Sequence, residues 1–349
     1  MRMSIEHLLP EGKKGVAMPE QTLPVSVVIC AYNSEKYLER ALGSICVQTY
    51  RNLEILVIDD ASTDSTADVA AAMAARDDRI RVITLESNGG VAHARQTGLE
   101  SIRHDWLLFL DADDVALPTM IEKQVEMLKT DANIIGVSTY AYLCGETETD
   151  IVGIQKVGIA IKDEFFEKYS RNKLIFLFIS TLFSKQHAID AGGFRLKGFP
   201  SSSHVRYQDF SEDVDLWCRL ADFAAKGKYL ITIPEPLFLY RKSAGSLSTT
   251  NIFRMQEKIR WIKDCLKRRR SGLPERSFEE HRKSLLFFRR IHYLRADYAA
   301  LAYRKMGLCY LKRQYSKALP LFALVCLLDP RLLVQKLKTQ KRKSTHGPW

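Results

Sequence analysis

Short apolar runs alternate with amphipathic segments along about the first 110 residues of the chain. Four runs of mainly β-branched or other apolar residues predict strands, at residues 25–30, 53–58, 81–85 and 106–110. The segments between them place apolar residues at helical spacing, at residues 34–45, 67–75 and 90–102. Strands that alternate with helices form βαβ units, and near-continuous apolar strands belong in a parallel sheet covered on both faces. The pattern therefore predicts an α/β fold with a doubly wound, mostly parallel sheet flanked by helices.

The rest of the chain is less regular and then becomes helical. An apolar segment and a Gly192-Gly193 turn precede an expected helix over 211–225 and an expected strand over 229–233. From residue 252 onward the pattern is helical, and the small residues at 243–246 mark a break before it. We therefore expect three parts: a flexible arm at residues 1–22, an α/β domain at 23–246 and a basic helical region at 247–349.

Charge is uneven along the chain, although the whole chain carries a net +11. Residues 1–250 contain 27 Lys and Arg against 34 Asp and Glu, whereas residues 251–349 contain 25 against 7. A basic region of this kind suits nucleic acid, an anionic membrane surface or an acidic substrate, and charge alone does not choose among them.

Cysteine spacing and hydropathy indicate a cytoplasmic protein. The seven cysteines are widely spaced and include no Cys-x-x-Cys pair, which is typical of free thiols in a reducing compartment. Residues 1–22 mix charged residues with prolines and lack the apolar stretch of a secretory signal. The chain has no run of about 18 apolar residues, so we expect no helix that spans a bilayer.

The most informative motif is Asp111-Ala-Asp113-Asp114, directly after the fourth predicted strand. Carboxylates two residues apart at a strand end point the same way and present hard oxygen ligands. Together with a diphosphate, two such oxygens can hold Mg²⁺ or Mn²⁺. Polar residues also follow the first two strands, at Tyr32-Asn33 and Asp59-Asp60. In a doubly wound sheet, ligands bind beyond these strand ends, where the loops converge.

Several segments, in order, resemble the nucleotide-binding half of the family 2 glycosyltransferases, which have the GT-A fold. The segments are residues 25–33, 48–50, 58–64, 88–98 and the acidic motif. The resemblance implies that a nucleoside pocket is lined by Ala31, Tyr32 and Asn33, and that Asp60 accepts a hydrogen bond from the base. It also implies that Arg95 lies near the base or the ribose, and that Asp111 lies near the ribose and the metal. It also implies that Asp113, with Asp111 beside it, is the principal ligand of Mn²⁺ or Mg²⁺.

A second cluster of carboxylates, Glu212-Asp213-Val-Asp215, opens the expected helix after Ser211. Acidic residues in a first helical turn complement the helix dipole, so this cluster alone has a simple structural explanation. Together with Gly192-Gly193-Phe194, however, it resembles the acceptor half of the same enzymes. The resemblance implies that Asp213 is the base that deprotonates the acceptor, with inversion at the anomeric carbon, and that Glu212 positions the acceptor.

The chain departs from the family pattern at two places, and a third segment only partly matches a signature of processive synthases. Tyr240-Arg241-Lys242 is followed by Ser243 where the family often has a metal-binding histidine, so a third protein ligand is not identified. Arg241 and Lys242 can still neutralise a leaving diphosphate. Arg195 stands where an aspartate is common. The segment 256–261 is similar to a Gln-x-x-Arg-Trp signature of processive synthases, but it is one residue too long and is interpreted as a helix face.

The sequence thus predicts an inverting transferase that moves a sugar from a nucleotide-diphosphate donor, UDP-sugar by resemblance, to a hydroxyl of a glycan or lipid-linked saccharide in surface-polysaccharide synthesis. The basic helices, interleaved with apolar residues, suit an anionic surface at the inner face of the plasma membrane rather than nucleic acid. One alternative is a nucleotidyltransferase, although residues 31–35 are not its glycine-rich loop. Another is a nucleic-acid- or membrane-binding protein with a degenerate catalytic domain.

Overall fold

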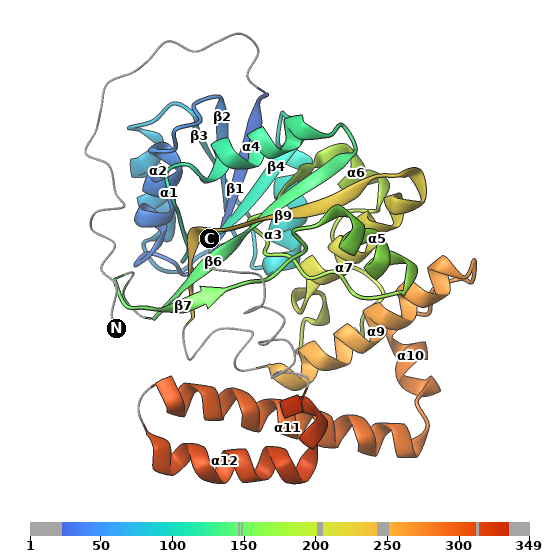
Figure 1. Cartoon of the computed structure of the whole chain (residues 1–349). Coiled ribbons are helices and arrows are strands. Elements are labelled where there is room, and N and C mark those ends of the chain that lie inside the picture. The colour runs from blue at the N-terminus through green and yellow to red at the C-terminus, as the bar shows by residue number, and fades with distance from the viewer. Residues whose placement is uncertain are drawn as a thin grey trace.

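The structure is a computed structural model that describes residues 23–145, 147, 149–200, 205–242, 251–311 and 314–334. The expected arm at residues 1–22, the expected break at 243–246 and the basic tail beyond residue 334 lie outside the described residues. The remaining segments form a central sheet flanked by helices, with further helices below it in the view of Figure 1.

The N-terminal half confirms the predicted alternation of strands and helices. Its strands are β1 (Val25–Ala31), β2 (Leu53–Asp59), β3 (Ile80–Thr84) and β4 (Trp106–Asp111), which run parallel in the order β3-β2-β1-β4. The helices between them are α1 (Leu38–Cys46), α2 (Thr66–Ala74) and α3 (Val91–Ser101). Every residue of β2 is buried, as expected of a strand inside a covered parallel sheet.

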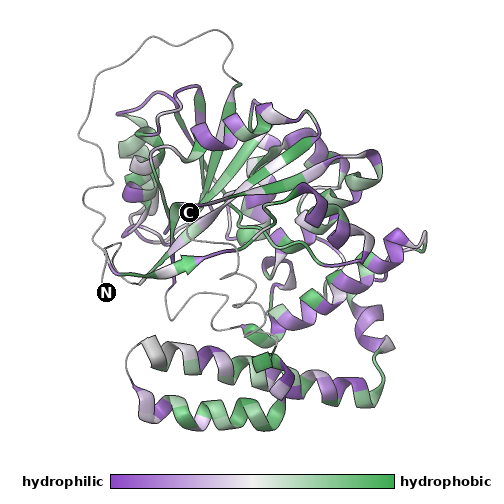
Figure 2. Cartoon of the chain, in the orientation of Figure 1, coloured by the Kyte–Doolittle hydropathy of each residue, from purple (hydrophilic) through white to green (hydrophobic). Residues whose placement is uncertain are grey.

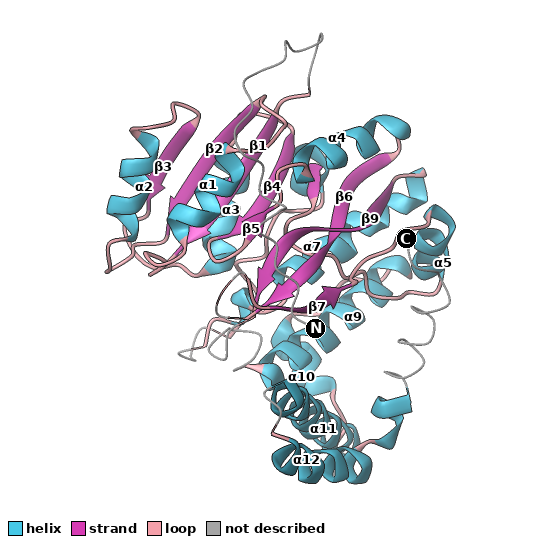
Figure 3. Ribbon diagram, turned by 60° about the vertical axis from the view of Figure 1, so that its left-hand side comes forward, coloured by secondary structure: helices cyan, strands magenta, loops and turns pink. Residues whose placement is uncertain are grey.

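The sheet continues beyond β4 with mixed pairing. The added strands are β5 (Val115–Ala116), β6 (Ile134–Cys144), β7 (Ile151–Gln155), β8 (Leu182–Ser184) and β9 (Tyr229–Arg241), which complete the order β3-β2-β1-β4-β8-β6-β9-β5 with β7 paired to β6. β8 is antiparallel to β4 and β6, whereas β9 is parallel to β6. Figure 3 shows the strands as one curved layer. The parallel arrangement expected from the sequence therefore describes the N-terminal half, and the complete sheet is mixed.

β9 is longer than the strand expected at residues 229–233. Pro234 and Pro236 stop a simple strand pattern, because proline cannot donate to a ladder. The pairing with β6 absorbs them by a register shift, from Thr139 opposite Ile233 to Tyr140 opposite Pro236. The strand then continues to Arg241, whose backbone N–H donates to Asp114 of the acidic motif.

Several helices complete the described fold. They are α4 (Met120–Thr130), α5 (Lys162–Ser170), α6 (Lys185–Asp190), α7 (Glu212–Leu220), α9 (Ile252–Arg270), α10 (Phe278–Ser284), α11 (Phe287–Leu311) and α12 (Tyr315–Leu328), with short 3-10 turns η2 (Tyr207–Asp209) and η3 (Ala221–Lys226). The expected helix over 211–225 is thus α7 followed by η3, and Gly227, with a φ of 75°, ends it.

The C-terminal helices make two different kinds of contact. α9 and α10 share a buried apolar cluster with the segment around α7, which includes Phe210, Trp261 and Phe278. α11 and α12 form a single hairpin, which is joined to α9 by the ion pair between Arg260 and Asp297 (2.7 Å). Among the helices that the structure describes, none has the length and apolar character needed to cross a bilayer.

Candidate active site

The carboxyl ends of β1, β2 and β4 lie side by side because these strands are parallel neighbours. Three non-glycine residues near this edge have left-handed backbones: Asn33 (φ 48°), Ala61 (φ 56°) and Ser211 (φ 52°). Such conformations cost about 1–3 kcal/mol each and tend to cluster at functional sites. The backbone strain therefore falls where the sequence places the candidate chemistry.

The loops after β1 and β2 form the expected nucleoside side of the site. Tyr32 keeps 48% of its surface exposed, whereas Ala31 is buried and its carbonyl accepts a hydrogen bond from Asp60 N (2.9 Å). Asn33 Oδ1 accepts from Thr63 N (2.8 Å), so this side chain fixes the loop after β2. Of these residues, Tyr32 offers the largest free surface for stacking.

Asp60 organises the loop before α3. Its buried carboxylate accepts hydrogen bonds from Gly89 N and Gly90 N, each at 2.8 Å. Each carboxylate oxygen still has a second lone pair for a ligand. The structure therefore gives Asp60 a loop-holding role that the sequence does not predict.

Asp209, in η2, is a site residue that the sequence analysis missed. Its Oδ1 accepts from Ala92 N (3.1 Å) at the start of α3, where a negative charge complements the helix dipole. Gly90 makes this approach possible, since a Cβ there would lie 2.1 Å from Asp209 Oδ2. Asp209 thereby connects the nucleoside side of the site to the segment that leads into α7.

Gly90→Ala should disrupt this connection. Gly90 has a φ of 88°, so alanine adds backbone strain of about 1–3 kcal/mol besides its overlap with Asp209. We expect a lower free energy of unfolding in urea and weaker UDP binding. Gly43→Ala is the matched control, because no atom lies within 4 Å of its added Cβ and alanine in helix α1 should stabilise by about 0.5–1 kcal/mol. Equal stability of the two variants would contradict this role of Gly90.

Arg95 joins the two halves of the candidate site. Its buried guanidinium pairs with Asp111 Oδ1 (2.6 Å) at the end of β4 and with Glu212 at the start of α7. Burial lowers the pKa of Arg95, but the charges of Asp111, Glu212 and Asp213 outweigh burial and raise this pKa above its usual value. Arg95 therefore contacts the acidic motif and the second carboxylate cluster at once, whereas the sequence resemblance places it near the base or the ribose.

The carboxylates of the acidic motif repel one another, and the nearby Arg241 only partly compensates their negative charge. Burial, followed by the charge of Asp111, raises the pKa of Asp113 to about 6. Burial, followed by the charges of Asp111 and Asp113, also holds the pKa of Asp114 well above its usual range. Asp114 Oδ1 accepts from Arg241 N (2.9 Å), and Arg241 Nε donates to the carbonyl of Asp113 (3.1 Å). The Arg241 guanidinium also lies 4.7 Å from the centre of the Tyr37 ring, which helps to fix its position. Through its hydrogen bonds to Asp113 and Asp114, Arg241 holds the acidic loop.

The donor set suits a divalent cation shared with a ligand. Within the described residues, no group of three or more His, Cys, Asp and Glu side chains is arranged to hold a metal ion by itself. The carboxylates of Asp111 and Asp113 are hard oxygen donors, and the pKa of Asp113 is raised partly because these like charges are close. A cation would offset that repulsion, so Asp111 and Asp113 fit Mn²⁺ or Mg²⁺ that is also held by phosphate oxygens.

The second carboxylate cluster lies at the N-terminus of α7. Burial raises the pKa of Glu212 to about 7, although Arg95 opposes this shift. Burial also raises the pKa of Asp213, whose Oδ1 accepts from Val214 N (2.8 Å). Asp215 differs, because Arg219 and Arg195 outweigh burial and keep its pKa below the usual value. Glu212 and Asp213 are thus the members of this cluster that titrate closest to neutrality.

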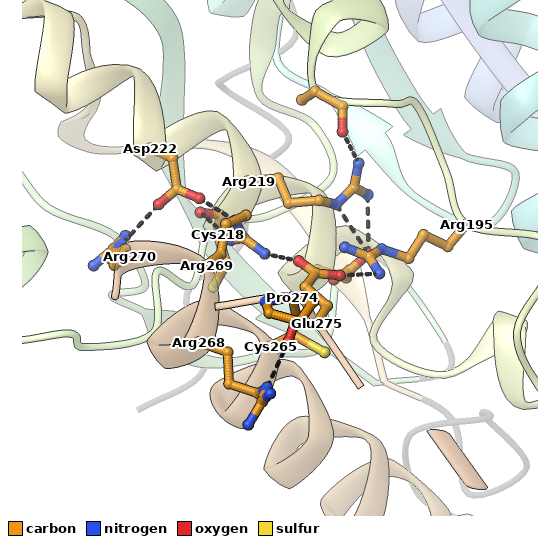
Figure 4. Close-up of polar contacts among 12 residues, drawn as sticks. Arg195, Cys218, Arg219, Asp222, Cys265, Arg268, Arg269, Arg270, Pro274 and Glu275 are labelled. Carbon is orange, nitrogen blue, oxygen red and sulfur yellow. Dashed lines mark hydrogen bonds and ion pairs between the residues drawn. The ribbon is translucent and has the colours of Figure 1, made fainter. Parts of the chain in front are cut away.

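The arginine at position 195 has a structural explanation. Arg195 pairs with Asp215 (3.0 Å) and with Glu275 (2.5 Å), and Glu275 also pairs with Arg269 of α9. Figure 4 shows Arg195 and Arg269 meeting at Glu275, with Arg219 beside them. Arg195 therefore connects the Gly192-Gly193 turn to the segment between α9 and α10. Lys242, the other basic candidate, lies exposed at the end of β9.

Two solved structures share this fold. The similarity to S. aureus TarS 1-349 in complex with UDP-GlcNAc extends over 87% of this chain and 90% of that structure, with a TM-score of 0.51 at 14% identity. The second structure is the mannosyltransferase PcManGT from Pyrobaculum calidifontis in complex with GDP-Man and Mn²⁺. The similarity extends over 91% of this chain and 90% of that structure, with a TM-score of 0.51 at 17% identity. At these identities the likeness shows the fold alone, which is the GT-A fold.

Sequence relatives identify the family. Residues 26–188 match Glycosyl transferase family 2. An uncharacterized glycosyltransferase of Haemophilus influenzae is 30% identical over 240 residues, which are 68% of this chain and 72% of the relative. The putative teichuronic acid biosynthesis glycosyltransferase TuaG of Bacillus subtilis is 38% identical over 104 residues, 30% of this chain and 41% of the relative. The chain belongs to glycosyltransferase family 2.

Proposed function

We propose that this glycosyltransferase moves a sugar from a UDP-sugar to a hydroxyl of a glycan or lipid-linked saccharide, with inversion at the anomeric carbon. The observation that carries the proposal is the double ion pair of Arg95 with Asp111 and Glu212. One side chain thereby contacts Asp111, a candidate metal ligand, and Glu212, which precedes the candidate base Asp213. This closeness supports the proposal, because a single in-line displacement needs donor and base side by side.

The nucleotide would bind along the ends of β1, β2 and β4. Tyr32 offers its ring to the base, Ala31 and Asn33 shape the pocket, and Asp60 accepts from the base through its remaining lone pairs. Asp111 and Asp113 would hold Mn²⁺ or Mg²⁺, which neutralises the diphosphate when bound. Arg241 keeps the acidic loop in place, and the Lys242 ammonium is available to the leaving diphosphate.

The acceptor would bind at the start of α7. Asp213 takes the proton of the attacking hydroxyl, and Glu212, fixed by Arg95, positions the acceptor. A base is most effective when its pKa lies near the working pH, and the burial that raises the pKa of Asp213 moves it in that direction.

Cell-surface polysaccharide synthesis is the process that this activity would serve. The similarity to a putative teichuronic acid biosynthesis enzyme supports that assignment. The test is turnover: the protein is incubated with UDP-sugars or a GDP-sugar, Mn²⁺ and a lipid-linked saccharide, and release of nucleoside diphosphate is measured.

The α11–α12 hairpin supports a peripheral position at the inner face of the plasma membrane. Its apolar side chains are unusually exposed, with Phe287 at 70% and Phe288 at 82%, and Arg289 and Arg290 follow them directly. The hydropathy colouring in Figure 2 shows the apolar character of α12 in the same hairpin. Basic residues beside exposed apolar ones suit an anionic surface with acyl chains beneath it.

Binding to anionic vesicles tests this position. We expect co-sedimentation with phosphatidylglycerol-containing vesicles at low salt and release at high salt, because each Lys or Arg near such a surface contributes about 1 kcal/mol. Phe287→Asp with Phe288→Asp should weaken binding strongly. Phe176→Asp is the control, since Phe176 is 44% exposed on the α/β domain. Absence of binding at low salt, or binding that high salt leaves intact, would contradict the electrostatic attachment.

A further inference from the structure

A lysine of the C-terminal helices is buried beside the second carboxylate cluster. Lys258, in α9, is only 1% exposed, and its Nζ donates to the carbonyl of Gln208 (2.8 Å) in η2. The ammonium also lies 4.9 Å from the ring of Phe199. Within the described part of the chain, no carboxylate forms a contact ion pair with it. A cation buried in this way is costly unless surrounding charges compensate it.

The compensating charges are carboxylates of the candidate site. Burial lowers the pKa of Lys258 to about 8, and the carboxylates that oppose this shift are Glu212, Asp215, Asp209 and Asp213, in descending order. These four carboxylates favour the ammonium form of Lys258. The attraction is mutual, since the charge of Lys258 lowers the pKa of Glu212 and of Asp213.

Residues around Lys258 hold the same turn. Glu257 accepts a hydrogen bond from the Tyr207 hydroxyl (3.0 Å), and the Phe278 ring lies 4.6 Å from the Tyr207 ring. Two hydrogen bonds therefore fix η2 to α9: Tyr207 binds Glu257, and the next residue, Gln208, binds Lys258. The third residue of η2, Asp209, reaches Ala92 at the nucleoside side, as described above.

The turn held by Lys258 leads directly into the candidate base. Only Phe210 and Ser211 separate Asp209 from Glu212, and Ser211 has a left-handed backbone. A strained residue persists only where its surroundings determine the conformation. A shift of η2 would therefore be transmitted to Glu212 and Asp213.

We propose that Lys258 is a positioning residue of the transfer reaction, which holds η2 and supplies the second buried cation, after Arg95, that faces Glu212 and Asp213. The inference rests on the proposed function, in which Asp213 is the base. The charged groups that face this pair are Arg95 of α3, Asp111 at the end of β4 and Lys258 of α9. Asp209 of η2 and Asp215 of α7 face Lys258 itself. The C-terminal region thereby contributes to the site through Lys258 of α9.

Lys258→Met tests the proposal, because it keeps much of the side-chain length but removes the hydrogen bond and the charge. We expect UDP affinity to fall less than in Gly90→Ala, because Asp60 still holds the loop before α3. We expect a kcat about 10- to 100-fold lower, the size of effect that a small misplacement of reacting groups produces. The acidic limb of the kcat–pH profile should also move to higher pH, since loss of a nearby cation raises the pKa of the base. Lys263→Met, an exposed lysine on the same helix, should behave as wild type.

Two further variants separate charge from folding. Lys258→Arg keeps the positive charge and should keep the wild-type position of the acidic limb. If Lys258→Met does not fold, Lys258→Gln replaces it, because the amide can still donate to Gln208 without the charge. Wild-type kcat and an unmoved acidic limb in the neutral variant would overturn the proposal. Asp213→Asn is measured alongside: retained turnover in that variant would instead contradict the proposed function.

Discussion

Asp213→Asn should lower kcat by about 10²- to 10⁴-fold, the usual contribution of a positioned general base, while UDP binding stays unchanged. The amide cannot take the proton of the acceptor hydroxyl, but it has nearly the same shape and can still accept from Val214 N. Steady-state kinetics with calorimetry of UDP binding separate the two quantities. The wild-type kcat should rise as pH increases through the range where this raised carboxylate pKa lies, because only the ionised form acts as a base.

Glu212→Gln is the matched comparison. It preserves side-chain length but weakens the pairing with Arg95, so we expect a higher KM for the acceptor and a smaller loss of kcat than in Asp213→Asn. A near-wild-type Asp213→Asn together with an inactive Glu212→Gln would mean that the roles of these two carboxylates are reversed.

Asp113→Ala should remove most of the enhancement that Mn²⁺ or Mg²⁺ gives to UDP binding, because the proposed cation joins this carboxylate to the diphosphate. In the wild type the enhancement should weaken as pH falls below about 6, where Asp113 takes up a proton. Calorimetry with and without metal measures both effects. Glu122→Ala, a carboxylate on α4 outside the site, is the control. UDP affinity that is independent of metal in the wild type would contradict the metal assignment.

The N-terminal half could be predicted because its strands are short apolar runs, three of which are followed by polar or acidic residues. The part of the sheet beyond β4 could not be predicted in the same way. β6 was not anticipated among the irregular segments, and β9 was expected to end before Pro234, since local proline rules do not include a register shift that depends on β6. Pairing between segments about 100 residues apart decided these elements.

The candidate site was predicted where residues follow a strand end or open a helix, as Asp60, Asp113 and Asp213 do. Asp209 and Lys258 were missed because their roles come from tertiary contacts. Lys258 did leave a signal, since it occupies the buried stripe of α9 that continues through Ile262 and Leu266. A lysine at an apolar position of a helix stripe indicates a buried charge with partners elsewhere.

The most direct test of the central claim is the anomeric configuration of the product. NMR can follow the protein, Mn²⁺, a UDP-sugar and a lipid-linked saccharide acceptor in one time course. The account predicts release of UDP that requires both metal and acceptor, with a glycosidic bond of configuration opposite to that of the donor. A product that retains the donor configuration would contradict the single displacement by Asp213, and no transfer from any nucleoside-diphosphate sugar would contradict the proposed donor class.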